Sequence, residues 1–84
     1  MSVEVRFFAS LRERVGTAQI RLDLPDPAGL DDLLGALGRR LPDADLAALT
    51  AENVRLAVNQ TLVAPPLRLC DGDEIAFLPP VTGG

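Results

Sequence analysis

The chain has 84 residues, of which 48% are hydrophobic and 24% are charged, and its net charge is −4 at pH 7. A chain of this length forms one domain with a thin core, and the composition is typical of a folded protein rather than a disordered one. The acidic balance argues against nucleic acid as the main partner. The sequence also lacks an apolar run long enough to span a membrane.

The residue types present exclude several kinds of catalytic chemistry. The sequence contains no histidine and no lysine, and its single cysteine is Cys70. A Cys/His metal cluster, a Ser-His or Cys-His nucleophile and a Schiff-base lysine are therefore excluded, and we expect no bound metal or cofactor. With no disulfide and no signal-peptide pattern, we expect a cytoplasmic protein. Cys70 adjoins an acidic turn and has no cationic neighbour in the sequence, so we interpret it as a structural or incidental residue and not as a functional thiol.

The N-terminal part of the chain predicts a strand, a helical turn and a second strand. Residues 2–9 alternate between apolar and polar positions, as in a half-buried strand. Residues 10–15, followed by Gly16, are typical of a short helical turn that a glycine closes. Alternation resumes over residues 17–24, which predicts a strand that returns beside the first one.

The main helix is expected next. Asp26 lies between two prolines, which predicts a helix start with Asp26 as the N-cap residue and Pro27 in the first turn. Pro42 predicts the end of this helix. Its apolar stripe has helical spacing and consists of Leu30, Leu33, Leu34, Leu37 and Leu41.

The C-terminal half predicts three more strands. Residues 43–53 form a polar, alanine-rich connection, with one helical turn around residues 46–49. Alternation then predicts strands at residues 54–58, 61–63 and 74–78. The expected turns between them are Asn59-Gln60 and Asp71-Gly72-Asp73. We interpret the two aspartates as turn residues and not as metal ligands.

This order of elements predicts an α+β fold, in which one mixed sheet packs on one main helix as a roll. A doubly wound sheet is excluded because strand–helix–strand alternation does not repeat. The expected core comprises Val3, Val5, Phe7, Ile20, Leu22, Leu30, Leu33, Leu34, Leu37, Val54, Leu56, Val58, Ile75 and Phe77.

Apolar side chains also fall on the polar faces of two strands. Phe8 shares a face with Glu4 and Arg6, and Leu78 ends the last expected strand. If the first and last strands are neighbours, both side chains lie on one open surface of the sheet, which Leu62 can join. Clustered exposed apolar residues mark protein contacts more often than isolated ones, so we expect a partner surface here.

The end of the sequence suggests that the C-terminal carboxylate is a reactive group that enters a partner's active site. Pro79-Pro80 stops the last strand, and Val81-Thr82-Gly83-Gly84 follows. We therefore expect a domain at residues 1–80 and a flexible tail at residues 81–84. Because glycine has no Cβ and allows another backbone to approach closely, a Gly-Gly carboxylate suits a partner's narrow active site. The alternative is a frayed terminus without a role.

A terminal carboxylate needs activation before it reacts, because its charge and resonance resist nucleophilic attack. Coupling to AMP supplies a leaving group, after which a sulfur donor yields a thiocarboxylate or an amine yields an amide. The domain itself then needs no acid, base or nucleophile, in agreement with the shortage of catalytic residue types.

Several motifs together resemble one known family. They are residues 58–63, Asp71-Gly72-Asp73-Glu74 and residues 77–84, with a similar start at residues 5–9, Arg12-Glu13 and Val15-Gly16. The chain resembles the small subunit of molybdopterin synthase over nearly its whole length, and the similarity is weakest between Leu30 and Glu52.

The resemblance implies a ubiquitin-like β-grasp fold and a role as sulfur carrier. An E1-like adenylyltransferase would use ATP to adenylate Gly84, and a sulfur donor protein would supply the sulfur of a terminal thiocarboxylate. The tail, with Gly83 giving room for threading, would enter the large synthase subunit, which converts cyclic pyranopterin monophosphate to molybdopterin. Two copies of the carrier, each with a terminal thiocarboxylate, would supply the two sulfur atoms of one dithiolene. The expected assembly is a heterotetramer with two small subunits at the ends of a large-subunit dimer.

The resemblance also implies a set of residues that contact the partners. Leu78 stands at a position that is commonly aromatic in the family, so this chain departs from the family there. The expected contact residues are Phe8, Arg12, Leu62, Leu78, Pro79, Pro80, Val81 and Thr82.

Three other functions remain open from the sequence. The first is a sulfur carrier for thiamine or cysteine synthesis, which shares the chemistry and differs in partner. The second is a ubiquitin-like modifier that is joined to lysines of other proteins. The third is an interaction domain whose tail has no role.

Overall fold

One mixed sheet forms the centre of the molecule, and three helices accompany it. The structure is a computed structural model that describes residues 1–80. Its elements are β1 (Ser2–Phe7), α1 (Ala9–Val15), β2 (Gln19–Asp23), α2 (Leu30–Gly38), α3 (Asp43–Leu49), β3 (Arg55–Val58), β4 (Thr61–Val63) and β5 (Glu74–Leu78). None of the helices in the described part of the chain is long and apolar enough to cross a membrane.

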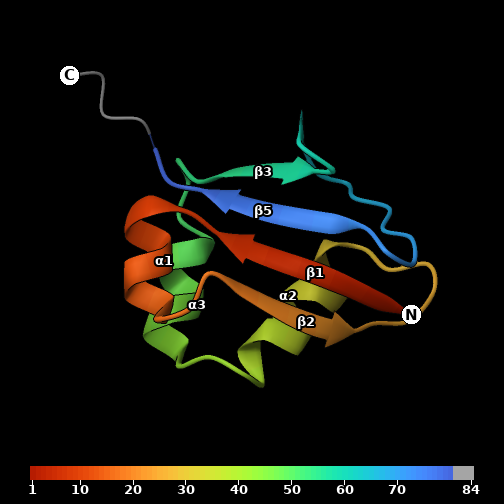
Figure 1. Cartoon of the computed structure of the whole chain (residues 1–84), viewed down its shortest axis with the longest axis horizontal. Helices are drawn as coiled ribbons and strands as arrows, with labels where there is room; N and C mark the ends of the chain where they lie inside the picture. The colour runs from red at the N-terminus through yellow and green to blue at the C-terminus, as the bar shows by residue number, and fades with distance from the viewer. Residues whose placement is uncertain (81–84) are drawn as a thin grey trace.

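The sheet has the strand order β2-β1-β5-β3-β4. Its two central strands, β1 and β5, come from opposite ends of the chain and run parallel, with Val5 opposite Ile75 and Phe7 opposite Phe77. The remaining pairs are antiparallel. Figure 1 shows β5 between β1 and β3, with α2 passing behind the sheet. The expected α+β roll is therefore confirmed, and so is the contact between the first and last strands.

The core lies between the sheet and the helices. In β1 every second residue is buried, and the rings of Phe7 and Phe77 stack with centroids 6.0 Å apart. Every residue of the expected core is buried or packs against the buried cluster. The structure adds six buried residues to this expected core: Leu11, Leu24, Ala28, Ala36, Leu49 and Leu69.

The start of the main helix was predicted wrongly. Helix α2 begins at Leu30, and its N-cap residue is Gly29, whose N–H donates to the carboxylate of Asp32 at 2.9 Å. Asp26 is therefore not the cap. The reason is a long-range pairing, because the N–H of Leu69 donates to the carbonyl of Ala28 at 2.8 Å. This pairing holds the chain extended where a helix was expected.

The end of this helix also differs from the prediction. Helix α2 ends at Gly38, four residues before Pro42. Pro42 instead precedes α3, a helix of seven residues where only one turn was expected. Asp43 and Asp45 lie in the first turn of α3, where carboxylates interact favourably with the helix dipole.

Two predicted turns are confirmed and hold the start of β5 in place. Asn59 and Gln60 both have positive φ, as the tight turn of a two-residue hairpin requires. The side chain of Asn59 donates to the carboxylate of Asp73 at 3.0 Å, and its oxygen accepts the N–H of Glu74 at 3.0 Å. At the second turn Gly72 has a φ of +85°, a conformation that favours glycine.

Candidate functional site

The candidate site is the face of the sheet opposite the core. In a strand, successive side chains point to opposite faces, so the burial of Val3, Val5 and Phe7 places Glu4 and Arg6 on the open face. Phe8 continues this alternation because its backbone is still extended, with φ −121° and ψ 151°. The end of β1 therefore presents an aromatic ring on the open face.

The register of the strands brings the three predicted apolar residues onto this face. Phe7 is opposite Phe77, so Phe8 lies beside Leu78 at the same end of the two parallel strands. Leu62 lies opposite Ala57, and Ala57 lies opposite Ala76. Phe8 is 40% exposed and Leu62 is 61% exposed, and these are the two large exposed hydrophobic residues of the described chain.

Two alanines form the floor between these larger side chains. Ala57 and Ala76 are each 5% exposed, yet neither belongs to the buried core cluster. Their small side chains leave a shallow apolar area between neighbouring strands. We call the set Phe8, Ala57, Leu62, Ala76 and Leu78 the apolar patch.

Arg6 and two carboxylates pair on this face, next to the apolar patch. Arg6 lies opposite Ala76 on β5, and its side chain lies 3.3 Å from Glu74 and 3.9 Å from Glu4. These are partly exposed ion pairs, which contribute little to stability, but they compensate the charge of Arg6. Phe8 and Leu62 of the apolar patch are open to solvent.

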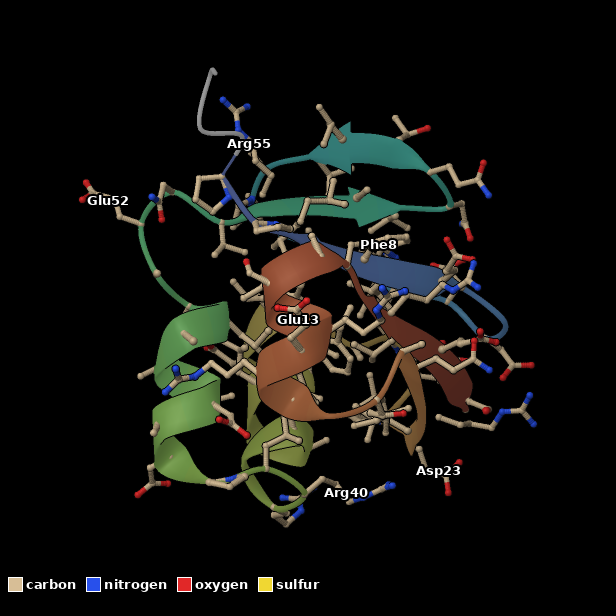
Figure 2. The ribbon with its side chains drawn as sticks, turned by 60° about the vertical axis from the view of Figure 1, so that its left-hand side comes forward. Phe8, Glu13, Asp23, Arg40, Glu52 and Arg55 are labelled. Atoms are coloured by element: carbon tan, nitrogen blue, oxygen red, sulfur yellow. The ribbon has the colours of Figure 1, made fainter. Side chains whose placement is uncertain are left out.

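Arg12 and Arg55 flank the apolar patch. Arg12 lies one helical turn after Phe8, and its backbone N–H donates to the Phe8 carbonyl at 3.3 Å. Arg55 is opposite Leu78 on β3. Figure 2 shows the Arg55 side chain extending away from the helices, and Phe8 where β1 passes into α1. The predicted contact residue Arg12 thus lies beside the patch, whereas Arg55 was not predicted.

The patch continues into a groove at the end of β5. Pro79 is half-buried and Pro80 is exposed, and both line a groove of about 1050 Å³ together with Leu62 and Leu78. The other walls come from α2, the segment before β3 and the end of β4. The structure therefore brings Leu62, Leu78, Pro79 and Pro80 together at this groove, and Phe8 and Arg12 lie on the other side of Leu78.

Cys70 lies away from this surface. It precedes the start of β5, whereas Leu78 ends that strand. The thiol residue is exposed, and its backbone N–H donates to the carboxylate of Asp73 at 2.8 Å. Within residues 1–80, no group of three or more His, Cys, Asp or Glu side chains could hold a metal ion.

Four predicted site residues, Val81, Thr82, Gly83 and Gly84, lie outside the described residues. Among the described residues, sequence reasoning did not identify Ala57 and Arg55 as neighbours of the apolar contact residues. Their places follow from the pairing of β3 with β4 and β5, and alternation within one strand contains no information on cross-strand register.

A mixed sheet wrapped on one main helix, with an apolar open face, defines the ubiquitin-like β-grasp class. The chain belongs to the ThiS family, whose model matches residues 5–84.

Curated relatives agree with this assignment over the full length. The chain is 44% identical to the molybdopterin synthase sulfur carrier subunit of Escherichia coli, with 98% of this chain and 99% of the relative covered. It is also 34% identical to small archaeal modifier protein 3 of Haloferax volcanii, with both chains covered completely.

Solved structures confirm the fold. A Pyrococcus furiosus protein described as molybdopterin converting factor subunit 1 superposes with a TM-score of 0.79 at 29% identity, and 96% of this chain and 99% of that chain are covered. A second similar structure is a protein–protein complex of subunits 1 and 2 of the molybdopterin-converting factor from Helicobacter pylori. The matched chain of that complex has a TM-score of 0.70 at 29% identity, and 100% of this chain and 100% of the matched chain are covered.

Proposed function

We propose that this chain is the sulfur carrier subunit of a molybdopterin synthase, with residues 1–80 as the folded domain and residues 81–84 as the reactive tail. The observation that carries the proposal is the position of the apolar patch. It lies at the end of β5, the strand that leads through Pro79-Pro80 to the Gly-Gly sequence. A partner that binds this face is therefore next to the point from which the tail departs.

The chemistry takes place on the carboxylate of Gly84. An E1-like adenylyltransferase transfers AMP from ATP to this carboxylate and releases pyrophosphate. Sulfide-level sulfur delivered by a donor protein then attacks the acyl carbon, so that a C–S bond forms as the C–O bond to AMP breaks, and a thiocarboxylate results. The thiocarboxylate sulfur bonds to cyclic pyranopterin monophosphate, and water cleaves its bond to the Gly84 acyl carbon, which restores the carboxylate. Two such transfers complete one dithiolene.

The chain contributes binding and orientation to this reaction, and the large subunit supplies the active site. Holding the reacting group in place is a large part of catalysis. In this proposal Gly83 and Gly84 enter the active site, and Val81 and Thr82 line the entry together with Pro79 and Pro80. The docked surface comprises Phe8, Arg12, Leu62 and Leu78.

The proposed assembly is a heterotetramer of two carriers on a large-subunit dimer. The complex of subunits 1 and 2 from Helicobacter pylori supports a direct contact between carrier and large subunit. In this proposal the carrier works in the cytoplasm and holds no cofactor of its own, since ATP is bound by the activating enzyme.

Intact mass measurement tests the proposal. The chain is incubated with its activating enzyme, ATP and a sulfide source, and fragmentation locates any mass change. The expected result is the replacement of one oxygen by one sulfur at Gly84. No mass change, while a control carrier gains sulfur from the same enzyme, would contradict the carrier role.

A second candidate is a ubiquitin-like modifier, because small archaeal modifier protein 3 is 34% identical over the whole chain. This function predicts conjugates of high mass in cells, which disappear when Gly84 is deleted. A carrier for thiamine or cysteine synthesis shares the mass change at Gly84. Copurification of a molybdopterin synthase large subunit separates that role from the proposed one.

A further inference from the structure

Arg55 occupies a special position on the open face. It is the first residue of β3 and lies opposite Leu78, so it borders the apolar patch at the end nearest Pro79. It also lines the groove at the end of β5. A partner that covers Leu78 and reaches toward the tail must therefore come close to the Arg55 guanidinium.

Within residues 1–80, Arg55 has no ion pair and no side-chain hydrogen bond. The ion pairs of this part of the chain involve Arg6 and Arg14, and the arginine side chains that donate hydrogen bonds are Arg6, Arg14 and Arg40. The nearest acidic residue in sequence, Glu52, points away from Arg55 in Figure 2. Next to the apolar patch, the charge of Arg6 is therefore compensated by carboxylates, whereas the charge of Arg55 is not.

This arrangement restricts the chemistry of a partner. Covering Arg55 with an apolar surface would remove its hydration and leave its charge without compensation, which is costly. A carboxylate matches the planar guanidinium with two parallel hydrogen bonds. Since the whole chain has a net charge of −4, overall attraction does not favour an acidic partner, and a carboxylate opposite Arg55 is a local, orienting feature.

We propose that Arg55 forms a salt bridge with a carboxylate of the synthase large subunit, beside the surface that covers Leu78, and that this pair orients the carrier for insertion of its tail. The inference rests on the proposed function, because the large subunit is its partner. Charged pairs at an interface act mainly on partner orientation and on the association rate.

The association rate of the full chain with the purified large subunit tests this proposal. We compare Arg55→Gln, which removes the charge, and Arg55→Glu, which reverses it, at low and high salt. The matched control is Arg39→Glu, because Arg39 is exposed, follows α2 and makes no ion pair among the described residues. Thermal unfolding of each variant shows whether its fold is intact. If Arg55→Glu perturbs folding, the comparison rests on Arg55→Gln, which changes the side chain less.

We expect Arg55→Glu to lower the association rate constant about tenfold at low salt, and Arg55→Gln to lower it about threefold. High salt should shrink both effects, because it screens exposed charges, and Arg39→Glu should stay within about twofold of the original chain. Equal association rate constants for Arg55→Glu and Arg39→Glu would overturn this inference and leave the proposed function intact. If the unaltered chain does not bind the large subunit, the proposed function fails and this inference fails with it.

Discussion

Ala9 is the first residue of α1 and directly follows Phe8, and its backbone has a φ of +50°. A residue with a Cβ atom in this left-handed region costs about 1 kcal/mol. Such strain is often found at functional positions, and here it accompanies the abrupt turn that leaves Phe8 on the open face. A single residue type, alanine instead of glycine, therefore lowers stability next to the proposed contact surface.

The substitution Ala9→Gly should raise the free energy of unfolding by about 0.5 to 1 kcal/mol, because glycine adopts positive φ without the Cβ clash. The control is Ala47→Gly in the exposed interior of α3, where the same change should lower the free energy of unfolding by about 1 kcal/mol. Urea unfolding of both variants measures the two effects. Destabilisation of similar size at both positions would show that the Ala9 backbone is not strained.

Among the secondary-structure elements, the strands were predictable and the main helix only in part. Strand alternation is local, so β4 and β5 were predicted with the bounds that the structure has. The start of α2 depends on the pairing of Ala28 with Leu69, which are 41 positions apart in the sequence. Helix-start residues such as Asp26 act locally, and no local pattern reveals that a distant segment holds the chain extended.

The prediction of contact residues on the open face of the sheet was limited in the same way. Phe8 and Leu78 were predictable because each is an apolar residue on a polar strand face, and Leu62 was predictable from its place just after the Asn59-Gln60 turn. The role of Arg55 was not, since an arginine in a strand normally points to solvent. The proposed role of Arg55 follows only from its position opposite Leu78 and from its lack of an ion pair among the described residues, whereas Arg6 is paired with Glu74.

Leu69 tests the importance of the long-range pairing. It is fully buried at 0% exposure, although its segment is not a regular strand. Leu69→Ala should lower the free energy of unfolding by about 3 kcal/mol, because it removes buried methyl groups and leaves a cavity. Leu67→Ala, at a half-buried position of the same segment, should cost clearly less. Urea unfolding compares the two, and equal losses would contradict a specific role for Leu69.

In the molecule as a whole, the core and the proposed docking surface lie on opposite faces of one sheet. The core cluster lies on the helix side, and Phe8, Ala57 and Ala76 of the apolar patch are outside it. A substitution on the open face can therefore weaken binding without unfolding the domain. A small carrier with a thin core depends on this separation, because it has little stability to lose.

Phe8→Ala should therefore weaken binding to the large subunit more than it lowers stability. Phe8 is 40% exposed, so we expect a loss of at most about 1 kcal/mol in the free energy of unfolding. Large aromatic residues at interface centres commonly contribute about 2 kcal/mol or more to binding. Titration calorimetry and thermal unfolding measure the two quantities. A large loss of melting temperature with intact binding would instead place Phe8 in the core.

The strongest test of this separation is deletion of Gly83 and Gly84. The described core ends with Phe77 in β5, so the truncated chain should keep its free energy of unfolding within about 0.5 kcal/mol. Because the reacting carboxylate is removed, sulfur transfer in a reconstituted synthase should be abolished. Binding to the large subunit through the apolar patch should remain measurable, which distinguishes a lost reaction from a lost contact. Restored cofactor synthesis by the truncated chain in a carrier-deficient extract would refute the mechanism.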